Sequence, residues 1–255
     1  MIADLPLTES AAARLAVVKH SASTNAELRA ASASDEWPHL SVLLTDDQRA
    51  GRGRLDRTWV TPAGSAVAIS VLLRELPESV EARGWLPLAA GWAMADAVAA
   101  QLAGHEVGVK WPNDVLVDGR KICGILAEAT PDAVIVGAGV NTAMTDEQLP
   151  VETATSFAVL GAEADPDRLV ADYVRALGAT VAALAAAPDA EAAGLHAALT
   201  GRCVTLGQDV TVSLPGGDVL QGTARRLDAL GRLVVEAADG EHAVAAGDVV
   251  HVRRV

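Results

Sequence analysis

The chain has 255 residues, of which 51% are hydrophobic, and its formal net charge is −13 at pH 7. Such a chain can bury a sizeable core, but its acidic balance argues against a protein that coats nucleic acid, because that binding needs a broad basic face. The first ten residues, MIADLPLTES, lack the segments of a signal peptide, and no apolar run reaches the roughly 20 residues of a membrane span. We therefore expect a cytoplasmic protein with no membrane or nucleic-acid partner, in which any positively charged site is local.

In chain order, the first predicted elements are a helix and two strands. Ser23, Thr24 and Asn25 begin a segment, STNAEL, that predicts a helix start capped by a Ser or Thr side chain. The runs at 39–48 and 65–76 predict strands. They are joined by a segment rich in arginine and glycine, QRAGRGRLDRTW, at 48–59. Over 86–102, small and apolar residues at helical spacing predict a helix packed on a sheet.

Four short β-type runs follow, at 106–111, 114–118, 121–129 and 132–140. Asp118-Gly119, between the second and third runs, favours a hairpin turn. Residues 166–199 are dominated by Ala and Leu and predict one or two helices. This order predicts an α+β domain, with a mixed or antiparallel sheet flanked by helices, and not a doubly wound fold.

The character of the sequence changes after residue 200. Short β-type runs at 203–207, 209–214, 219–228, 232–237 and 242–255 are separated by turn-forming segments, which is typical of a small β-barrel. We predict two domains, 1–200 and 201–255. Cys123 and Cys203 lie far apart, without His or Cys at metal-ligand spacing, and are predicted to be buried free thiols.

Two segments carry candidate chemistry. In the loop at 48–59, Gly51 and Gly53 allow the backbone to approach a ligand, while Arg52 and Arg54 offer forked donors suited to phosphate or carboxylate. The loop matches neither the P-loop nor the dinucleotide fingerprint, and by itself it is better explained as a solvated surface loop. In the second segment, GVKWPNDVLVDGRKICGILAE at 108–128, Lys110 is expected to end a strand at a rigid turn. Its neighbour Trp111 is more simply explained as a core aromatic.

Four motifs in this order resemble biotin–protein ligases: STN at 23–25, QRAGRGR at 48–54 with Trp59, KWPNDVLVDGRKICGIL at 110–126, and VGAGVN at 136–141. The resemblance implies a catalytic core like that of class II aminoacyl-tRNA synthetases, followed by an SH3-like β-barrel. Some family members carry a DNA-binding domain ahead of this core. Only about twenty residues precede the STN motif here, so we expect the form without that domain.

The resemblance also implies a two-step activity. Biotin is activated by ATP to biotinyl-5'-AMP, and the biotinyl group is then transferred to a lysine of the biotin carboxyl carrier domain of acyl-CoA carboxylases. Mg²⁺ is expected with ATP; Asp114 is a candidate ligand that could equally be a turn former. A monomer and a homodimer are both compatible with the sequence. The alternatives are a lipoate–protein ligase or transferase and a non-catalytic biotin sensor or regulator.

Carried onto this sequence, the resemblance assigns three overlapping sets of residues. The catalytic set, which would stabilise the negative charge of the transition state, is Lys110, Arg52 and Arg54. The biotin-binding set is Ser23, Thr24, Asn25, Gln48, Gly51, Arg52, Gly53, Arg54, Lys110 and Gly124. The ATP-binding set is Arg52, Arg54, Trp59, Lys110, Asn113 and Asn141. Ser23 to Asn25 could instead serve only as a helix cap, and Trp59, Asn113 and Asn141 as turn or packing residues. Gly137 and Gly139 fit close backbone packing and direct ligand approach equally.

Overall fold

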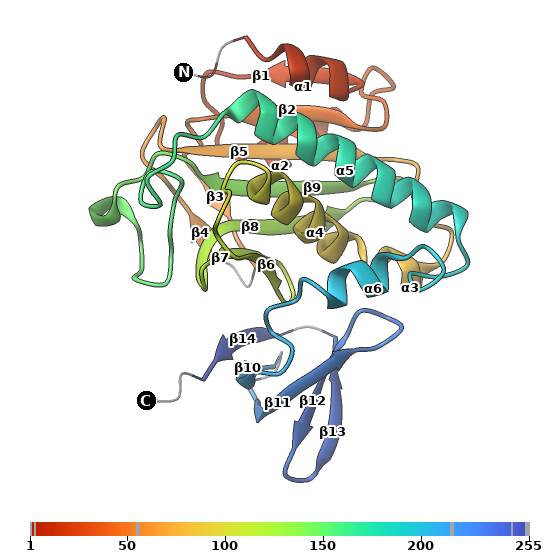
Figure 1. The fold of residues 1–255 in the computed structure, drawn as a ribbon. Helices are drawn as coiled ribbons and strands as arrows, with labels where there is room; N and C mark the ends of the chain where they lie inside the picture. The colour runs from red at the N-terminus through yellow and green to blue at the C-terminus, as the bar shows by residue number, and fades with distance from the viewer. Residues whose placement is uncertain (1, 3, 55–56, 215–216, 246, 253–255) are drawn as a thin grey trace.

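The structure, a computed structural model, describes residues 2, 4–54, 57–214, 217–245 and 247–252. Its main body is a seven-stranded sheet in the order β1-β2-β5-β9-β8-β7-β6 (Figure 1). The strands are β1 (Arg14–Val17), β2 (Ser41–Thr45), β5 (Ala66–Leu73), β6 (Val107–Lys110), β7 (Asp114–Val117), β8 (Arg120–Ala129) and β9 (Val134–Asn141). β1 runs parallel to β2 and the other neighbours are antiparallel, so the sheet is mixed, as predicted.

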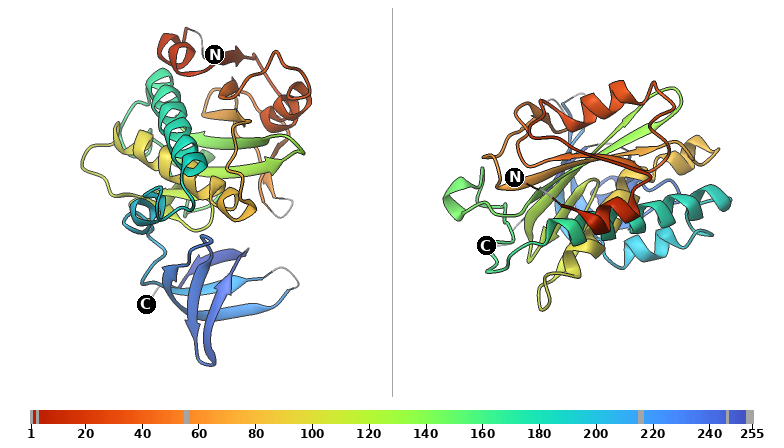
Figure 2. Two further views of the ribbon diagram at one scale, coloured as in Figure 1. Left: turned by 90° about the vertical axis from the view of Figure 1, so that its right-hand side faces the viewer. Right: turned by 90° about the horizontal axis from the view of Figure 1, so that it is seen from above.

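Helices lie on both faces of this sheet. One face is covered by α4 (Leu86–Ala99) and α5 (Pro166–Ala186), and the opposite face by α2 (Thr24–Ala31) (Figures 1 and 2). Strand residues alternate between the two sides. On β9, Val136 and Val140 join the large core under α4 and α5, whereas Ile135 joins a smaller cluster around Leu28 of α2. The remaining helical segments are α1 (Pro6–Ala11), α3 (Val80–Arg83), the 3-10 turn η1 (Asp146–Gln148) and α6 (Leu195–Thr200).

The predicted elements are present, with local differences. Ser23 caps α2, its side chain accepting from the backbone N–H of Ala26. Asp118 and Gly119 join β7 and β8 with φ of 49° and 77°, as a primed hairpin turn requires. The loop at 48–59 contains a hairpin of its own, β3 (Gly51–Arg52) with β4 (Thr58–Trp59). Residues 55–56 of that loop lie outside the described residues.

A second, five-stranded antiparallel sheet has the order β13-β12-β11-β10-β14. Its strands are β10 (Asp209–Ser213), β11 (Val219–Leu227), β12 (Leu233–Ala237), β13 (Gly240–Val244) and β14 (Asp248–His251). The segment at 242–255, read as one strand from sequence, thus contributes to two strands, and its residues 246 and 253–255 lie outside the described part. The division into domains at residue 200 stays a prediction.

Cys203–Gly207 is not a strand, contrary to the sequence prediction. The segment is built of turns and runs beside β6, where the N–H of Val109 donates to the Arg202 carbonyl and the N–H of Val204 donates to the Val109 carbonyl. Trp111 is 2% exposed and donates from Nε1 to the Gly231 carbonyl at 3.0 Å. The prediction of Trp111 as a core aromatic is therefore confirmed, and this residue also ties the second sheet to the first.

Helix α5 has 21 residues and is, among the described helices, the one that is long and apolar enough to cross a membrane by length and composition. Its apolar side is buried in the core, and it packs against α4 and α1. These contacts are those of a core helix. The two cysteines are buried and free, as predicted, and burial raises the pKa of both thiols.

Candidate active site

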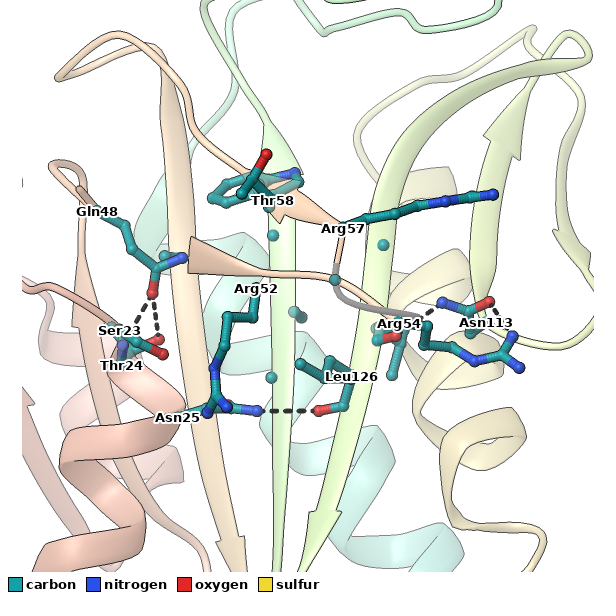
Figure 3. Close-up of a pocket in the computed structure, with 18 of the residues that line it drawn as sticks. Ser23, Thr24, Asn25, Gln48, Arg52, Arg54, Arg57, Thr58, Asn113 and Leu126 are labelled. Atoms are coloured by element: carbon teal, nitrogen blue, oxygen red, sulfur yellow. Dashed lines mark hydrogen bonds between the residues drawn. The ribbon is translucent and has the colours of Figure 1, made fainter. Parts of the chain in front are cut away.

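A pocket lies on the α2 side of the main sheet, under the β3–β4 hairpin (Figure 3). One end is formed by the start of α2 and by Gln48; the other is formed by the turn before β7, the start of β8 and Asp248 from the second sheet. The lining residues are Ser23, Thr24, Asn25, Gln48, Arg52, Gly53, Arg54, Arg57, Thr58, Trp59, Ala68, Ile69, Asn113, Asp114, Lys121, Gly124, Ile125, Leu126, Gly137, Ala138, Gly139 and Asp248.

Glycines on β9 make room in the face of the sheet. A Cβ built on Gly137 would lie 2.4 Å from Asn25 Oδ1, and one on Gly139 would lie 2.5 Å from the Trp59 ring. Both distances are far below van der Waals contact, so any larger residue would displace these side chains. Gly137 and Gly139 are therefore required for the packing of two side chains that line the pocket.

The α2 end of the pocket is polar and buried, and the side chains that the start of α2 and Gln48 contribute to it are uncharged. The backbone N–H and the hydroxyl of Thr24 both donate to Gln48 Oε1, at 2.8 and 3.0 Å. The Ser70 hydroxyl donates to Asn25 Oδ1 at 2.6 Å and lies 2.8 Å from Thr24 Oγ1. Thr24, Asn25 and Gln48 are each less than 9% exposed. This network holds amide and hydroxyl groups in fixed orientations, which suits recognition of a neutral polar group.

The opposite end of the pocket is basic. Arg54 donates from Nη1 to Asn113 Oδ1 at 3.0 Å and from Nη2 to the Gly247 carbonyl at 3.3 Å. Lys121 Nζ lies 2.6 Å from Asp114 Oδ1. Burial lowers the pKa of Arg54, while the nearby carboxylates of Asp114 and Asp248 oppose that shift. The cations gathered here suit a ligand whose second end is an anion.

Arg52 and Arg54 of the hairpin point in different directions. In Figure 3, Arg52 extends toward Asn25, whereas Arg54 extends toward Asn113. Arg52 Nη2 lies 3.0 Å from Glu128 Oε1, and Arg57 forms an ion pair with Asp248 of β14. With Arg52, Arg54, Arg57 and Lys121, the described lining carries four basic residues against two acidic ones, Asp114 and Asp248. The lining of the pocket is thus net positive, although the chain as a whole is acidic.

Three residues of the predicted site do not line the pocket, and Lys110 is the most consequential. It is half-buried at the end of β6, beside Asp114, Asp248 and His251. Burial lowers the pKa of its amine, and the two carboxylates oppose that shift. The lysine that lines the pocket is Lys121.

The pairing of β7 with β8 explains how Lys121 comes to line the pocket. It skips one residue, Ile122, so that Leu116 faces Lys121 while Val115 faces Cys123. This bulge places Lys121 beside Gly124, where a Cβ would lie 3.1 Å from Lys121 Nζ. The motif containing Lys121 was recognised in the sequence, but a bulge cannot be read from the motif.

Gly51 and Asn141 also lie outside the lining. A Cβ on Gly51 would lie 2.3 Å from the Trp59 carbonyl oxygen, so its role is to let the hairpin close. Asn141 is 7% exposed and donates from Nδ2 to the Thr155 carbonyl at 2.9 Å, which holds the following loop. The other predicted residues do line the pocket: Ser23, Thr24, Asn25, Gln48, Arg52, Gly53, Arg54, Trp59, Asn113 and Gly124.

Sequence reasoning missed Lys121, Arg57, Asp248 and Glu128. Lys121, Arg57 and Glu128 lie within the two segments that were singled out, but Asp248 carries no local signal because only folding brings it to the pocket. Among the described residues, no group of three or more His, Cys, Asp or Glu side chains could hold a metal ion. Asp114, the candidate magnesium ligand, is paired with the ammonium of Lys121 and does not form such a site by itself.

Comparisons with known proteins identify the family and the fold. The model of the biotin/lipoate A/B protein ligase family matches residues 17–141, and that of the biotin protein ligase C terminal domain matches residues 205–252. The chain is 41% identical to the biotin–[acetyl-CoA-carboxylase] ligase of Mycobacterium tuberculosis, over 94% of this chain and 90% of that protein.

Two solved structures share the fold. One is the biotin protein ligase of Aquifex aeolicus in complex with biotin and ATP, with a TM-score of 0.77 at 24% identity, covering 95% of this chain and 100% of that one. The other is the biotin protein ligase of Leishmania major in complex with biotinyl-5-AMP, with a TM-score of 0.63 at 25% identity, covering 95% of this chain and 99% of that one. The predicted catalytic core followed by a small β domain is confirmed.

Proposed function

Because this chain belongs to the biotin/lipoate A/B protein ligase family and is a biotin protein ligase, we propose that the pocket of Figure 3 is where biotin is joined to AMP. The observation that carries this proposal is the polarity of the pocket. An end with the uncharged, hydrogen-bonded side chains of Thr24, Asn25 and Gln48 leads to an end formed by Arg54 and Lys121. Biotin has the same polarity, with a neutral ureido head and a carboxylate at the end of its side chain.

The neutral end binds the ureido head. Asn25 Oδ1 accepts one hydrogen bond, from Ser70, and has a second lone pair available for a ureido N–H. The Ser23 hydroxyl accepts from the backbone N–H of Ala26 and can donate its own hydrogen to the ureido carbonyl. A ligand without this head would leave these buried groups unpaired, and it is rejected for that reason.

The basic end carries out the first step. The biotin carboxylate attacks the α-phosphorus of ATP, a P–O bond to biotin forms, and the bond to pyrophosphate breaks. Both reactants are anions, and the transition state gathers more charge on the α-phosphoryl oxygens. Lys121 and Arg54 stabilise that charge from fixed positions, which is usually the largest contribution to such catalysis. Lys121 takes the role that the sequence assigned to Lys110.

ATP occupies the part of the pocket between Trp59 and Arg57. Mg²⁺ enters with ATP as its phosphate complex, because Mg²⁺ binds readily to phosphates together with one or two carboxylates. The residues present do not form a magnesium site before ATP binds, since Asp114 is paired with Lys121. Asp114 and Asp248 are released from their basic partners when the phosphates arrive.

The second step transfers biotin to a carrier. A neutral lysine amine attacks the acyl carbon of the mixed anhydride, an amide bond forms, and AMP leaves. We expect the acceptor to be the biotin carboxyl carrier domain of an acyl-CoA carboxylase, in keeping with the name of the Mycobacterium tuberculosis relative. We further expect the reaction in the cytoplasm, with the protein acting as a monomer or a homodimer.

Pyrophosphate release tests this function. The protein is mixed with ATP and magnesium, with biotin or lipoate, and with or without a carrier fragment. We expect release that depends on biotin, followed by labelling of one carrier lysine. Release that depends on lipoate would establish the lipoate alternative. Biotin binding without any release would establish a sensor.

A further inference from the structure

Glu128 contacts Asn25 and Arg52, which line the biotin-head end of the pocket, and neither reaction step gives it a role. It sits on β8, its side chain is 17% exposed, and its two oxygens have different partners. Oε2 accepts from Asn25 Nδ2 at 2.8 Å, and Oε1 accepts from Arg52 Nη2 at 3.0 Å. One carboxylate thus joins a residue at the start of α2 to a residue of the hairpin above the pocket.

The first contact fixes the direction of the Asn25 amide. Asn25 Nδ2 donates to the Leu126 carbonyl at 3.1 Å as well as to Glu128, so both of its hydrogens are used. The Leu126 carbonyl and the Glu128 carboxylate can only accept hydrogen bonds. A flipped Asn25 amide would place its oxygen against these two oxygens and lose both hydrogen bonds. Asn25 Oδ1 is therefore held on the side of Ser70 and Gly137.

The second contact fixes the hairpin over the pocket. Arg52 belongs to β3, whose described sheet partner is the short strand β4. Its side chain is 52% exposed and crosses to Glu128, as Figure 3 shows by its direction toward Asn25. The hairpin is thereby tied to the main sheet on the side away from Arg54. An isolated ion pair of this exposure contributes little stability. Here the carboxylate of Glu128 is also held by the buried amide of Asn25, so its position is more restricted than in an isolated surface pair.

We propose that Glu128 is a positioning residue of the biotin-head end, a clasp that holds Asn25 in its ureido-accepting orientation and ties Arg52 across the pocket over bound biotin. The proposal rests on the proposed function. It assigns Arg52 to the retention of biotin and leaves stabilisation of the phosphoryl charge to Arg54 and Lys121. The clasp acts on the binding of biotin and not on the chemical step, because neither of its contacts reaches the basic end.

The test compares Glu128→Gln, Arg52→Gln and the double variant with the unmodified protein. The readouts are the dissociation rate of biotin measured without ATP, and KM for biotin and kcat in pyrophosphate release. We expect Glu128→Gln to raise the biotin dissociation rate and KM about tenfold, as for a lost hydrogen bond to a charged group, with kcat at saturating biotin within about twofold. Arg52→Gln should raise the biotin dissociation rate and KM about threefold in the native background. In the Glu128→Gln background it should raise them less than about twofold.

A matched control is Glu241→Gln, which breaks a pair of the same type with Arg226 on the second sheet. It should leave the dissociation rate and KM unchanged. Arg52→Gln alters only the hairpin, so it tests the clasp even if a change at Glu128 prevents folding. Unchanged biotin dissociation in Arg52→Gln, multiplicative effects in the double variant, or a loss confined to kcat would each overturn the proposal. If the unmodified protein neither binds biotin nor releases pyrophosphate, the proposed function itself fails.

Discussion

Replacing Lys121 by methionine should slow biotinyl-adenylate formation by about 10²–10³-fold, which is the usual cost of removing one preorganised donor from a charged transition state. The substitution keeps an unbranched, flexible side chain and removes its terminal ammonium. It also leaves Asp114, 19% exposed and now without its partner at 2.6 Å, as a negative charge beside the reacting anions. Both effects act in the same direction, so we expect a loss near 10³-fold, or about 4 kcal/mol.

Lys110→Met is the matched control, because Lys110 belongs to the same motif but does not line the pocket. We expect its kcat to stay within about fivefold of the native value, since half-burial already disfavours its charge. The assay is biotin-dependent pyrophosphate release at saturating biotin and ATP, with the fold checked by circular dichroism. Near-normal release by Lys121→Met together with a 100-fold loss in Lys110→Met, on the order of one lost donor, would refute the assignment and restore Lys110.

Two further predictions concern packing and pH. Gly137→Ala should raise KM for biotin at least about tenfold, because its Cβ would lie 2.4 Å from Asn25 Oδ1 and the amide must move. The control is Gly201→Ala, whose Cβ would have no contact closer than 3.6 Å and which should leave KM unchanged. Equal changes in KM in the two variants would contradict the reasoning. Burial, aided by the charge of Lys110, lowers the pKa of His251 from 6.5 to about 4. As the pH falls below 6.5, His251 is therefore protonated in the unfolded state before it is protonated in the folded state. The free energy of unfolding decreases toward pH 4 for this reason. Urea unfolding of His251→Gln should show a smaller decrease over this range than the native protein, and parallel curves would argue against the prediction.

Much of the fold could be predicted because its elements are locally consistent. The four runs from β6 to β9 are bounded by turn residues, and α4 and α5 have apolar spacing over 14 and 21 residues. β1 could not be predicted, since four residues that pair in parallel with β2 leave no distinct pattern. The strand predicted at 203–207 is wrong for a related reason: the segment pairs with β6 through one isolated bridge, Val109 with Cys203, and continues as turns instead of a ladder.

The site divides in the same way. The polar end could be predicted, because Ser23, Thr24 and Asn25 form a short motif at a helix start. For the basic end, the sequence predicted the segments that form it but not which lysine lines the pocket. Lys110 and Lys121 belong to the same motif, and the bulge at Ile122 brings Lys121 to the side of β8 on which Gly124 lines the pocket. Asp248 reaches the pocket from the second sheet, so no local pattern could indicate it.

The central claim is that biotin lies with its head at Asn25 and that its activated carboxyl end is held by Lys121 and Arg54. A crystal structure with a non-hydrolysable analogue of biotinyl-5'-AMP tests it most directly. We predict the ureido group beside Asn25 and the phosphate mimic within hydrogen-bond distance of Lys121 Nζ and Arg54. A phosphate mimic held by Lys110, with Lys121 still paired to Asp114, would contradict the claim.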